Sequence, residues 1–178
     1  MSPIDLNATI KKLDAFSMRE KKPLHLVLLG GLALQHYGME NRSTIDLDAE
    51  VEGDLESLFL FLKTQGIPSD LSENISGWSV VAMPPGYRER AITRFKSEFL
   101  EVCVLDPCDF VISKLRRFSE EDVQDALFVV KKYEIQTDQV SRFAEAALEH
   151  SIKDTTLFLF RKNVDLFLKK IKKEYRNK

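Results

Sequence analysis

Two aspartates separated by one residue, Asp46 and Asp48, are the side chains of this sequence that most clearly suggest chemistry. They lie in residues 44–51, where apolar and acidic side chains alternate strictly, as in a half-buried β-strand. Carboxylates at positions i and i+2 of a strand point to the same side, where they repel each other unless a cation lies nearby. Mg²⁺ prefers a few carboxylates combined with substrate phosphates. The pattern therefore predicts a site for one or two divalent cations.

A pair of glycines, Gly30 and Gly31, precedes this acidic strand. Residues 24–29 before the pair are mostly apolar and predict a buried strand, and residues 32–37 after it suit a short helix. Glycines let the backbone approach a phosphate closely, and the amides at the start of a helix donate hydrogen bonds to it. The glycine pair is therefore a candidate phosphate-binding turn.

The turn between the glycines and the acidic strand carries Arg42 and Thr44, which we count with the glycines as candidate nucleotide-binding residues. The Arg42 guanidinium is suited to a phosphate contact. A Mg²⁺ or Mn²⁺ ion held by Asp46 and Asp48 would bridge to a bound triphosphate. It would offset the charge that develops in phosphoryl or nucleotidyl transfer.

Each of these features also has a purely structural interpretation. Gly30 and Gly31 alone could form a plain turn between a strand and a helix. Asp46 and Asp48 alone could line the solvated face of an edge strand, and Arg42 could be an ordinary loop charge. The occurrence of all of them at this spacing favours the site over its separate structural explanations.

The remaining elements follow from periodicity and capping residues. Further strands are predicted at residues 78–83 and 99–105. Helices are predicted at residues 7–21, 55–65, from 107 after Asp106, from 120 after Ser119, at 137–150 and at 154–175. These elements predict an α+β fold: a small mixed β-sheet flanked by helices, with a helical C-terminal part. We expect an α/β core at residues 1–106 and a helical region at residues 107–178 packed on it.

Composition restricts the class of protein. The chain has 178 residues, 44% of them hydrophobic and 30% charged, with a net charge of −2, as is usual for a globular domain. The bulk charge does not indicate a polyanion-binding protein. Residues 161–178, however, contain eight Lys or Arg against two acids, which suits either RNA contact or a solvated helix face.

Cysteine and histidine positions give no sign of a metal site in the sequence. Cys103 and Cys108 are too few for a disulfide framework and lack a zinc-type spacing, and a buried thiol is the interpretation we favour for Cys103. The three histidines, at positions 25, 36 and 150, do not form a metal-binding motif either. The N-terminal residues show no secretory pattern, and no apolar run approaches the roughly 20 residues that span a bilayer. We therefore expect a cytoplasmic protein without a membrane segment.

The ordered set of motifs resembles the nucleotidyltransferase superfamily, whose signature is a Gly-Gly or Gly-Ser pair followed at a short distance by Asp-x-Asp or Asp-x-Glu. Later segments are similar to a little-characterised branch close to the abortive-infection toxins of bacteria and archaea. The resemblance covers roughly residues 24–130, and its later segments are Met83-Pro84-Pro85-Gly86-Tyr87-Arg88-Glu89-Arg90, Val104-Leu105-Asp106-Pro107-Cys108-Asp109, Ser113-Lys114-Leu115 and Asp122-x-x-Asp125.

This resemblance implies a nucleotidyltransferase fold in which Asp46 and Asp48 bind the metal. In such enzymes a third carboxylate comes from a neighbouring strand. Glu101 is our candidate for that third metal ligand, because it is a lone acid among the apolar residues 99–104. As a catalytic residue it would also activate the acceptor hydroxyl.

The resemblance also implies functional roles in the C-terminal part. The Asp-x4-Lys motif of the toxin relatives is matched by Asp109 and Lys114, and a later acid is matched by Asp122 or Asp125. Structural alternatives remain open: Asp109 lies in a first helical turn, Lys114 could extend to solvent, and Asp122 suits a capping box with Ser119. Asp125 has no such alternative, so Lys114 and Asp125 are our candidate catalytic residues here.

The functional hypothesis is an enzyme that binds a nucleoside triphosphate with Mg²⁺ or Mn²⁺ and transfers the nucleoside monophosphate to RNA, such as tRNA, or to a protein. By resemblance it could be the toxin of a pair, with an antitoxin protein as partner. The alternative is a nucleotide- or partner-binding module of the same fold with weak or lost catalysis, which Glu121 favours because related sequences often have lysine there. A third interpretation is a structural protein that forms oligomers through its C-terminal helices.

Overall fold

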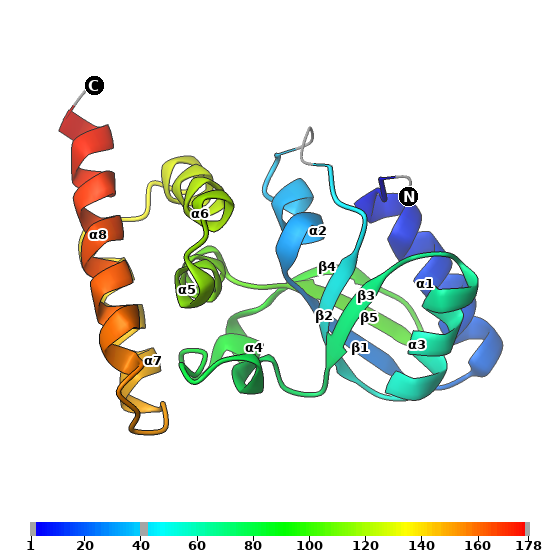
Figure 1. Cartoon of the computed structure of the whole chain (residues 1–178). Helices are drawn as coiled ribbons and strands as arrows, with labels where there is room; N and C mark the ends of the chain where they lie inside the picture. Colours follow the sequence, from blue (N-terminus) through cyan, green and yellow to red (C-terminus); the bar gives the residue numbers. More distant parts are fainter. Residues whose placement is uncertain (1–2, 40–42, 177–178) are drawn as a thin grey trace. The chain divides into compact units, whose positions relative to one another are not determined.

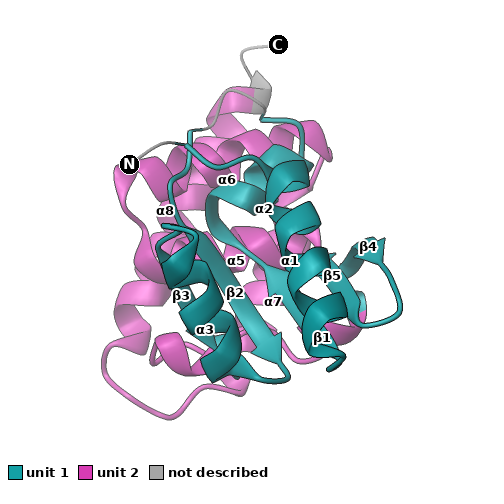
Figure 2. Ribbon diagram, turned by 90° about the vertical axis from the view of Figure 1, so that its right-hand side faces the viewer, with its two compact units in different colours: residues 1–75, 90–105 teal, residues 76–89, 106–178 magenta. Residues whose placement is uncertain are grey.

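The computed structural model describes residues 3–39 and 43–176, with the side chains of residues 175 and 176 left out (Figure 1). The chain forms two compact units. The first comprises residues 1–75 and 90–105, and the second comprises residues 76–89 and 106–178 (Figure 2). The predicted class, a small mixed sheet flanked by helices with a helical C-terminal part, is confirmed. The domain boundary at residues 106/107 remains a prediction.

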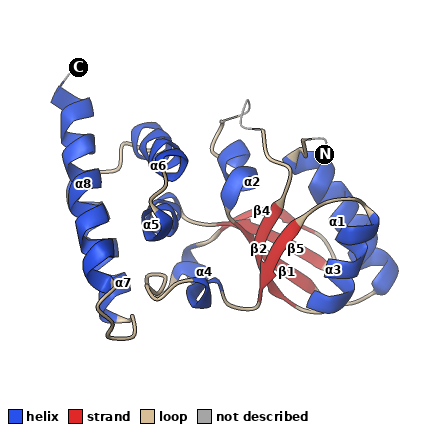
Figure 3. Ribbon diagram, in the orientation of Figure 1, coloured by secondary structure: helices blue, strands red, loops and turns tan. Residues whose placement is uncertain are grey.

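The first unit is built on a β-sheet, drawn in red in Figure 3, whose five strands have the order β3-β2-β1-β5-β4. The central strand β1 runs antiparallel to β2 and parallel to β5. The outer strand β3 is parallel to β2, and β4 is antiparallel to β5. The strands are β1 Leu24–Leu28, β2 Leu47–Glu52, β3 Ser69–Ser72, β4 Ile92–Lys96 and β5 Leu100–Val104.

The two faces of this sheet differ in chemistry. Alternation along the strands and the pairing register place Leu26, Val51 and Val102 on one face, and all three are buried. The helices α1 (Leu6–Glu20), α2 (Gly30–His36) and α3 (Leu55–Thr64) lie on one side of the sheet (Figure 2). The opposite face carries polar side chains from three strands, namely His25, Asp48, Glu50, Glu52, Glu101 and Cys103.

The second unit is mainly helical. Its first three longer helices begin where the sequence predicts, and the last begins at Leu157 instead of residue 154. The first of them is capped by Asp106 with Pro107 at its start, and the next by a capping box of Ser119 and Asp122. The helices are α5 Pro107–Arg117, α6 Glu120–Lys132, α7 Thr137–Glu149 and α8 Leu157–Arg176. Over the described residues, none of the helices combines the length and apolar character needed to cross a membrane.

The predicted strand at residues 78–83 is wrong. The short 3₁₀ helix η1 (Ile75–Trp78) is followed by irregular chain up to α4 (Tyr87–Arg90). The backbone N–H groups of this segment donate to serine hydroxyls instead of to a neighbouring strand. These bonds are Val81 to Ser79 at 3.2 Å, Ala82 to Ser151 at 2.8 Å and Met83 to Ser76 at 2.7 Å.

The acidic strand is shorter than predicted, and four elements were not predicted at all. Strand β2 begins at Leu47, where the backbone N–H donates to the carbonyl of Pro68, so Thr44 and Asp46 precede the strand. Ile45, predicted to lie on the buried face, has 43% of its surface exposed. The elements absent from the prediction are β3, η1, α4 and β4.

Candidate functional site

The carboxylate of Asp48 lies directly against Gly30. The backbone N–H of Leu29 donates to the carbonyl of Asp48 at 3.0 Å, which fixes the end of β1 beside this part of β2. Gly30 has φ +58°, and a Cβ atom built on it would overlap the Asp48 side chain, with Cγ only 2.9 Å away. Glycine is therefore required here both for its backbone conformation and for the space that the carboxylate occupies.

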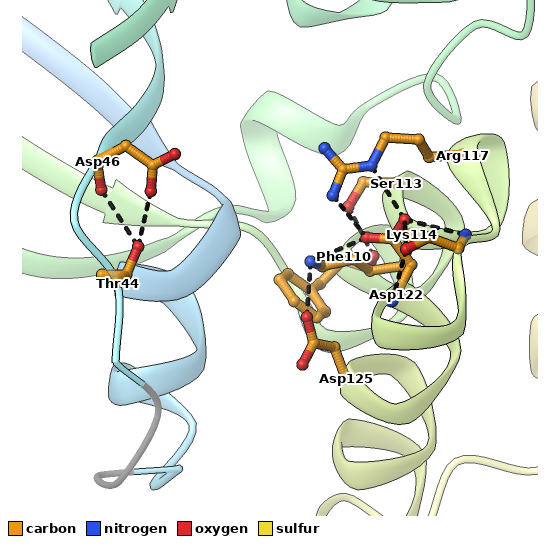
Figure 4. Close-up of polar contacts among 9 residues, drawn as sticks. Thr44, Asp46, Phe110, Ser113, Lys114, Arg117, Asp122 and Asp125 are labelled. Atoms are coloured by element: carbon orange, nitrogen blue, oxygen red, sulfur yellow. Dashed lines mark hydrogen bonds and ion pairs between the residues drawn. The ribbon is translucent and has the colours of Figure 1, made fainter. Parts of the chain in front are cut away.

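The second glycine, Gly31, lies similarly close to the side chain of Thr44. A Cβ atom at Gly31 would overlap the side chain of the buried Thr44. The Thr44 hydroxyl in turn donates to Oδ1 of Asp46 at 2.7 Å (Figure 4). Gly31 thus allows the close approach of the hydroxyl that orients the Asp46 carboxylate.

The glycine pair therefore lies beside the two aspartates, as the sequence predicts. Gly30 contacts Asp48 directly, and Gly31 contacts Thr44, which is bonded to Asp46. Asp48 is a half-buried strand residue, whereas Asp46 is exposed and is positioned by Thr44 rather than by the pleat of β2. Asp46, Asp48 and Thr44 offer carboxylate and hydroxyl oxygens, the type of donor that Mg²⁺ or Mn²⁺ takes. Arg42, the predicted phosphate contact, lies outside the described residues.

Substitution at Gly30 tests this packing. We expect Gly30→Ala to lower the free energy of unfolding by about 2–3 kcal/mol, because left-handed backbone strain adds to the overlap with Asp48. Gly66→Ala is the matched control, since Gly66 has φ +65° and no atom within 4 Å of its Cβ position, and should cost only about 1 kcal/mol. Urea unfolding of both variants measures the difference. Equal losses would show that Asp48 does not occupy this space.

Glu101, the predicted third ligand, is not brought to the Asp46–Asp48 pair. The register places Glu101 opposite His25 of β1, and His25 opposite Glu52 of β2. Glu52 is four residues beyond Asp48, which is roughly 13 Å along the strand. Glu101 instead accepts a hydrogen bond from Lys96 at 2.8 Å, and this contact holds the pKa of Glu101 below its usual range.

Lys114 and Asp125, the candidates of the C-terminal part, contact each other within the second unit (Figure 4). The Lys114 ammonium on α5 donates to Asp125 at 2.8 Å and to Asp122 at 3.2 Å, both on α6. All three residues are buried. The arrangement neutralises a buried lysine and joins α5 to α6.

Asp122 accepts several hydrogen bonds within this cluster. It accepts two hydrogen bonds from the Arg117 guanidinium, at 2.8 and 2.9 Å, and one from the Ser119 hydroxyl at 2.7 Å. Burial raises the pKa of Asp122, but these hydrogen bonds and the charge of Lys114 outweigh it, so the pKa lies far below its ordinary value. The predicted capping box with Ser119 is confirmed.

Comparison with known proteins identifies the superfamily. The model of the family described as "Nucleotidyltransferase of unknown function (DUF6036)" matches residues 4–176. The chain belongs to this family. The resemblance to the nucleotidyltransferase superfamily is thereby confirmed, and with it, in general terms, a transferase that acts on a nucleotide. No curated protein and no solved structure matched the chain.

In this DUF6036 protein, the orienting role of Thr44 is the feature of the site that sequence reasoning missed. The nucleotide-binding role of Thr44 stays a prediction, while its hydroxyl donates to Asp46. The signal was present in the sequence, because a threonine two residues before an aspartate can bond locally to it in a turn. Its burial against Gly31 follows only from the tertiary structure.

The low pKa of Asp122 gives a pH-dependent prediction for the same protein. A carboxyl whose native pKa is depressed contributes stability above its unfolded pKa of about 4, and loses it as the pH falls towards the native value. We expect wild type to be more stable than Asp122→Asn at pH 7, and the difference to shrink below about pH 4. Urea unfolding across this range measures it. A stability difference between wild type and Asp122→Asn that does not change with pH would contradict the low pKa of Asp122.

Proposed function

We propose that this chain transfers a nucleoside monophosphate from a nucleoside triphosphate to an acceptor hydroxyl, with Mg²⁺ or Mn²⁺ held by Asp46 and Asp48. The observation that carries the proposal is the contact of Gly30 with Asp48 and of Gly31 with Thr44, which brings the glycine pair and the acidic segment of the sequence into one site. When bound, the cation would bridge the triphosphate oxygens and offset their developing charge.

The residues of the chain have separate roles in this proposal. Gly30 lies against the Asp48 carboxylate and Gly31 against Thr44, and the backbone of the two glycines would hold the triphosphate beside the metal. Thr44 keeps Asp46 in one orientation, and the exposure of Asp46 leaves the site open to substrate. The acceptor hydroxyl loses its proton to solvent, and its oxygen forms a bond to the α-phosphorus. The bond from that phosphorus to the bridging oxygen breaks, and pyrophosphate leaves.

The acceptor is proposed to be RNA, such as tRNA, or a protein side chain, and the chain to be the toxin of a toxin–antitoxin pair. Support comes from the resemblance of residues 83–125 to the toxin branch. On the basis of that resemblance, we propose that Lys114 and Asp125 assist the transfer. Further support for RNA comes from α8, where Arg161, Lys162 and four later lysines are exposed (Lys169, Lys170, Lys172 and Lys173).

One observation favours a second candidate, a nucleotide-binding module with weak catalysis. Glu101 does not join the aspartate pair, so the site lacks the third carboxylate that the sequence predicted. In this alternative the chain would bind the triphosphate with its metal but would transfer the nucleoside monophosphate slowly or not at all.

Labelled triphosphates distinguish the two functions. Each of the four nucleotides is supplied with Mg²⁺ or Mn²⁺, labelled at either the α- or the γ-phosphate, together with tRNA, total RNA and a protein mixture. Nucleotidyl transfer labels an acceptor from the α-label only, while transfer of the terminal phosphate would label it from the γ-label only. Binding of nucleotide without labelling of any acceptor would favour the module and contradict the enzyme.

A further inference from the structure

The first unit contains a cavity at the other end of its sheet from Asp48. Its volume is about 510 Å³, and it lies where β1 and β5 begin, with walls from β1, β2, β4 and β5. The polar side chains that line it include His25, Glu52, Lys96 and Glu101. The proposed nucleotide transfer does not use this cavity, so a ligand bound here would be independent of that reaction.

Three side chains at this end of the sheet lie within reach of a single ion. His25 and Glu101 are register partners on the parallel strands β1 and β5, and Cys103 follows Glu101 by two residues on the same face. One ligand atom from each lies within 4.8 Å of the other two. Among the described residues, this is the one group of three or more His, Cys, Asp or Glu side chains whose ligand atoms lie this close together.

We propose that His25, Glu101 and Cys103 form a binding site for a borderline divalent metal ion of the Zn²⁺ type. An imidazole nitrogen, a carboxylate oxygen and a thiolate are the donors that Zn²⁺ takes, and a hard cation such as Mg²⁺ avoids the sulfur. The ligand atoms of a tetrahedral zinc site lie roughly 3.3–3.8 Å apart, so small rotations of these side chains would close the site. The fourth position would be taken by water or by an anionic ligand.

Lys96 is the competitor for this site. Its ammonium lies 2.8 Å from Glu101, and with 66% of its side chain exposed it can move into solvent when a cation arrives. Thr93 also contacts both Glu101, at 3.4 Å, and Cys103, at 3.7 Å. When the metal binds, the S–H bond of Cys103 breaks, a bond from sulfur to the metal forms, and the proton passes to solvent. No oxidant or reductant takes part in this step.

A cobalt titration of the full chain tests the site directly. Tag-free, metal-free protein is titrated with Co²⁺, whose visible and near-ultraviolet bands report tetrahedral geometry and thiolate ligation, and Zn²⁺ is then added in competition. We expect one ion per chain, a thiolate-to-cobalt band, and displacement of Co²⁺ by Zn²⁺. His25→Ala and Cys103→Ser should each weaken Zn²⁺ binding by at least about a hundredfold.

Two further variants serve as matched controls. Cys108→Ser removes the other cysteine of the chain, which lies in the second unit, and should leave the cobalt spectrum and the affinity unchanged. Lys96→Met removes the competing ammonium and should tighten binding by up to about fivefold. Circular dichroism of each variant establishes that it is folded. If Cys103→Ser does not fold, the half-buried His25, replaced by Asn, decides the question.

Three results would overturn the proposal. The first is a folded wild type that gives no thiolate-to-cobalt band. The second is an equal loss of binding in Cys108→Ser and Cys103→Ser. The third is Zn²⁺ affinity that His25→Ala does not change. Asp48→Asn should leave the cobalt spectrum intact, so failure of this site and failure of the nucleotide site are separable.

Discussion

Replacement of Asp48 by asparagine is expected to lower the rate of nucleotide transfer at least about a hundredfold, and Asp46→Asn to do the same. Loss of one carboxylate from a two-carboxylate metal site removes several kcal/mol of charge stabilisation, and each 1.4 kcal/mol corresponds to a factor of about ten in rate. Asparagine keeps the shape of the side chain against Gly30, so the fold should be retained. The rate is measured as metal-dependent acceptor labelling by the preferred α-labelled triphosphate.

The control for this experiment is an acid of the same unit with no part in the site. Glu56 is exposed on α3, and Glu56→Gln should keep the wild-type rate within about twofold. Circular dichroism of all three variants excludes unfolding as the cause. Transfer that persists in Asp46→Asn and Asp48→Asn would show that the reaction takes place elsewhere on the chain.

Replacement of Lys114 by methionine is expected to have the largest effect on stability, a loss of about 3–5 kcal/mol in the free energy of unfolding. The ammonium is buried, and its removal leaves the carboxylate of Asp125 buried without this cation at 2.8 Å. Asp122 keeps its hydrogen bonds from Arg117. Urea unfolding at pH 7 measures the loss.

An exposed ion pair of the same unit provides the comparison. Arg142 and Asp138 lie 3.4 Å apart on α7 with side chains that are 70% and 72% exposed, so Arg142→Met should cost no more than about 0.5 kcal/mol. A loss below about 1 kcal/mol for Lys114→Met would mean that the cluster does not stabilise the α5–α6 pair. Asp125→Asn combined with Lys114→Met should cost less than the two single losses together, because the partners interact directly.

Helix starts were the features best predicted from the sequence. Asp54, Asp106 and Ser119 each accept a backbone hydrogen bond from the first turn of the helix that they precede. These signals are local, since the cap and its helix are adjacent in the chain. The strands β1 and β5 were also predictable, because four of the five residues in each are apolar, with His25 and Glu101 as the exceptions.

Edge strands were not predictable in the same way. Strand β3 has the sequence Ser-Asp-Leu-Ser, which has no apolar alternation, and it exists because β2 pairs with it. The apolar residues of 78–83 were misread because serine hydroxyls bind the backbone donors that a strand would use. The missing prediction of β3 and the wrong strand at residues 78–83 thus both depend on hydrogen-bond partners that local patterning does not show.

The candidate site shows the same division. The contact of Gly30–Gly31 with Thr44 and Asp48 was predictable as a motif, although the hydroxyl that orients Asp46 was not assigned. Glu101 was misplaced because the position of an acid along a sheet depends on strand register, which local patterning does not specify. The same register places Glu101 beside His25, where the sequence showed no metal-binding motif.

The most direct test of the nucleotide site is the binding of Mn²⁺ together with a triphosphate that cannot be cleaved between its α- and β-phosphates. Free Mn²⁺ is followed by electron paramagnetic resonance in wild type and in Asp48→Asn, and Mn²⁺ favours oxygen ligands such as those of Asp46 and Asp48. We expect saturable binding in wild type that depends on the nucleotide and weakens at least about tenfold in the variant. Equal binding of Mn²⁺ and nucleotide by both proteins would contradict the proposed site.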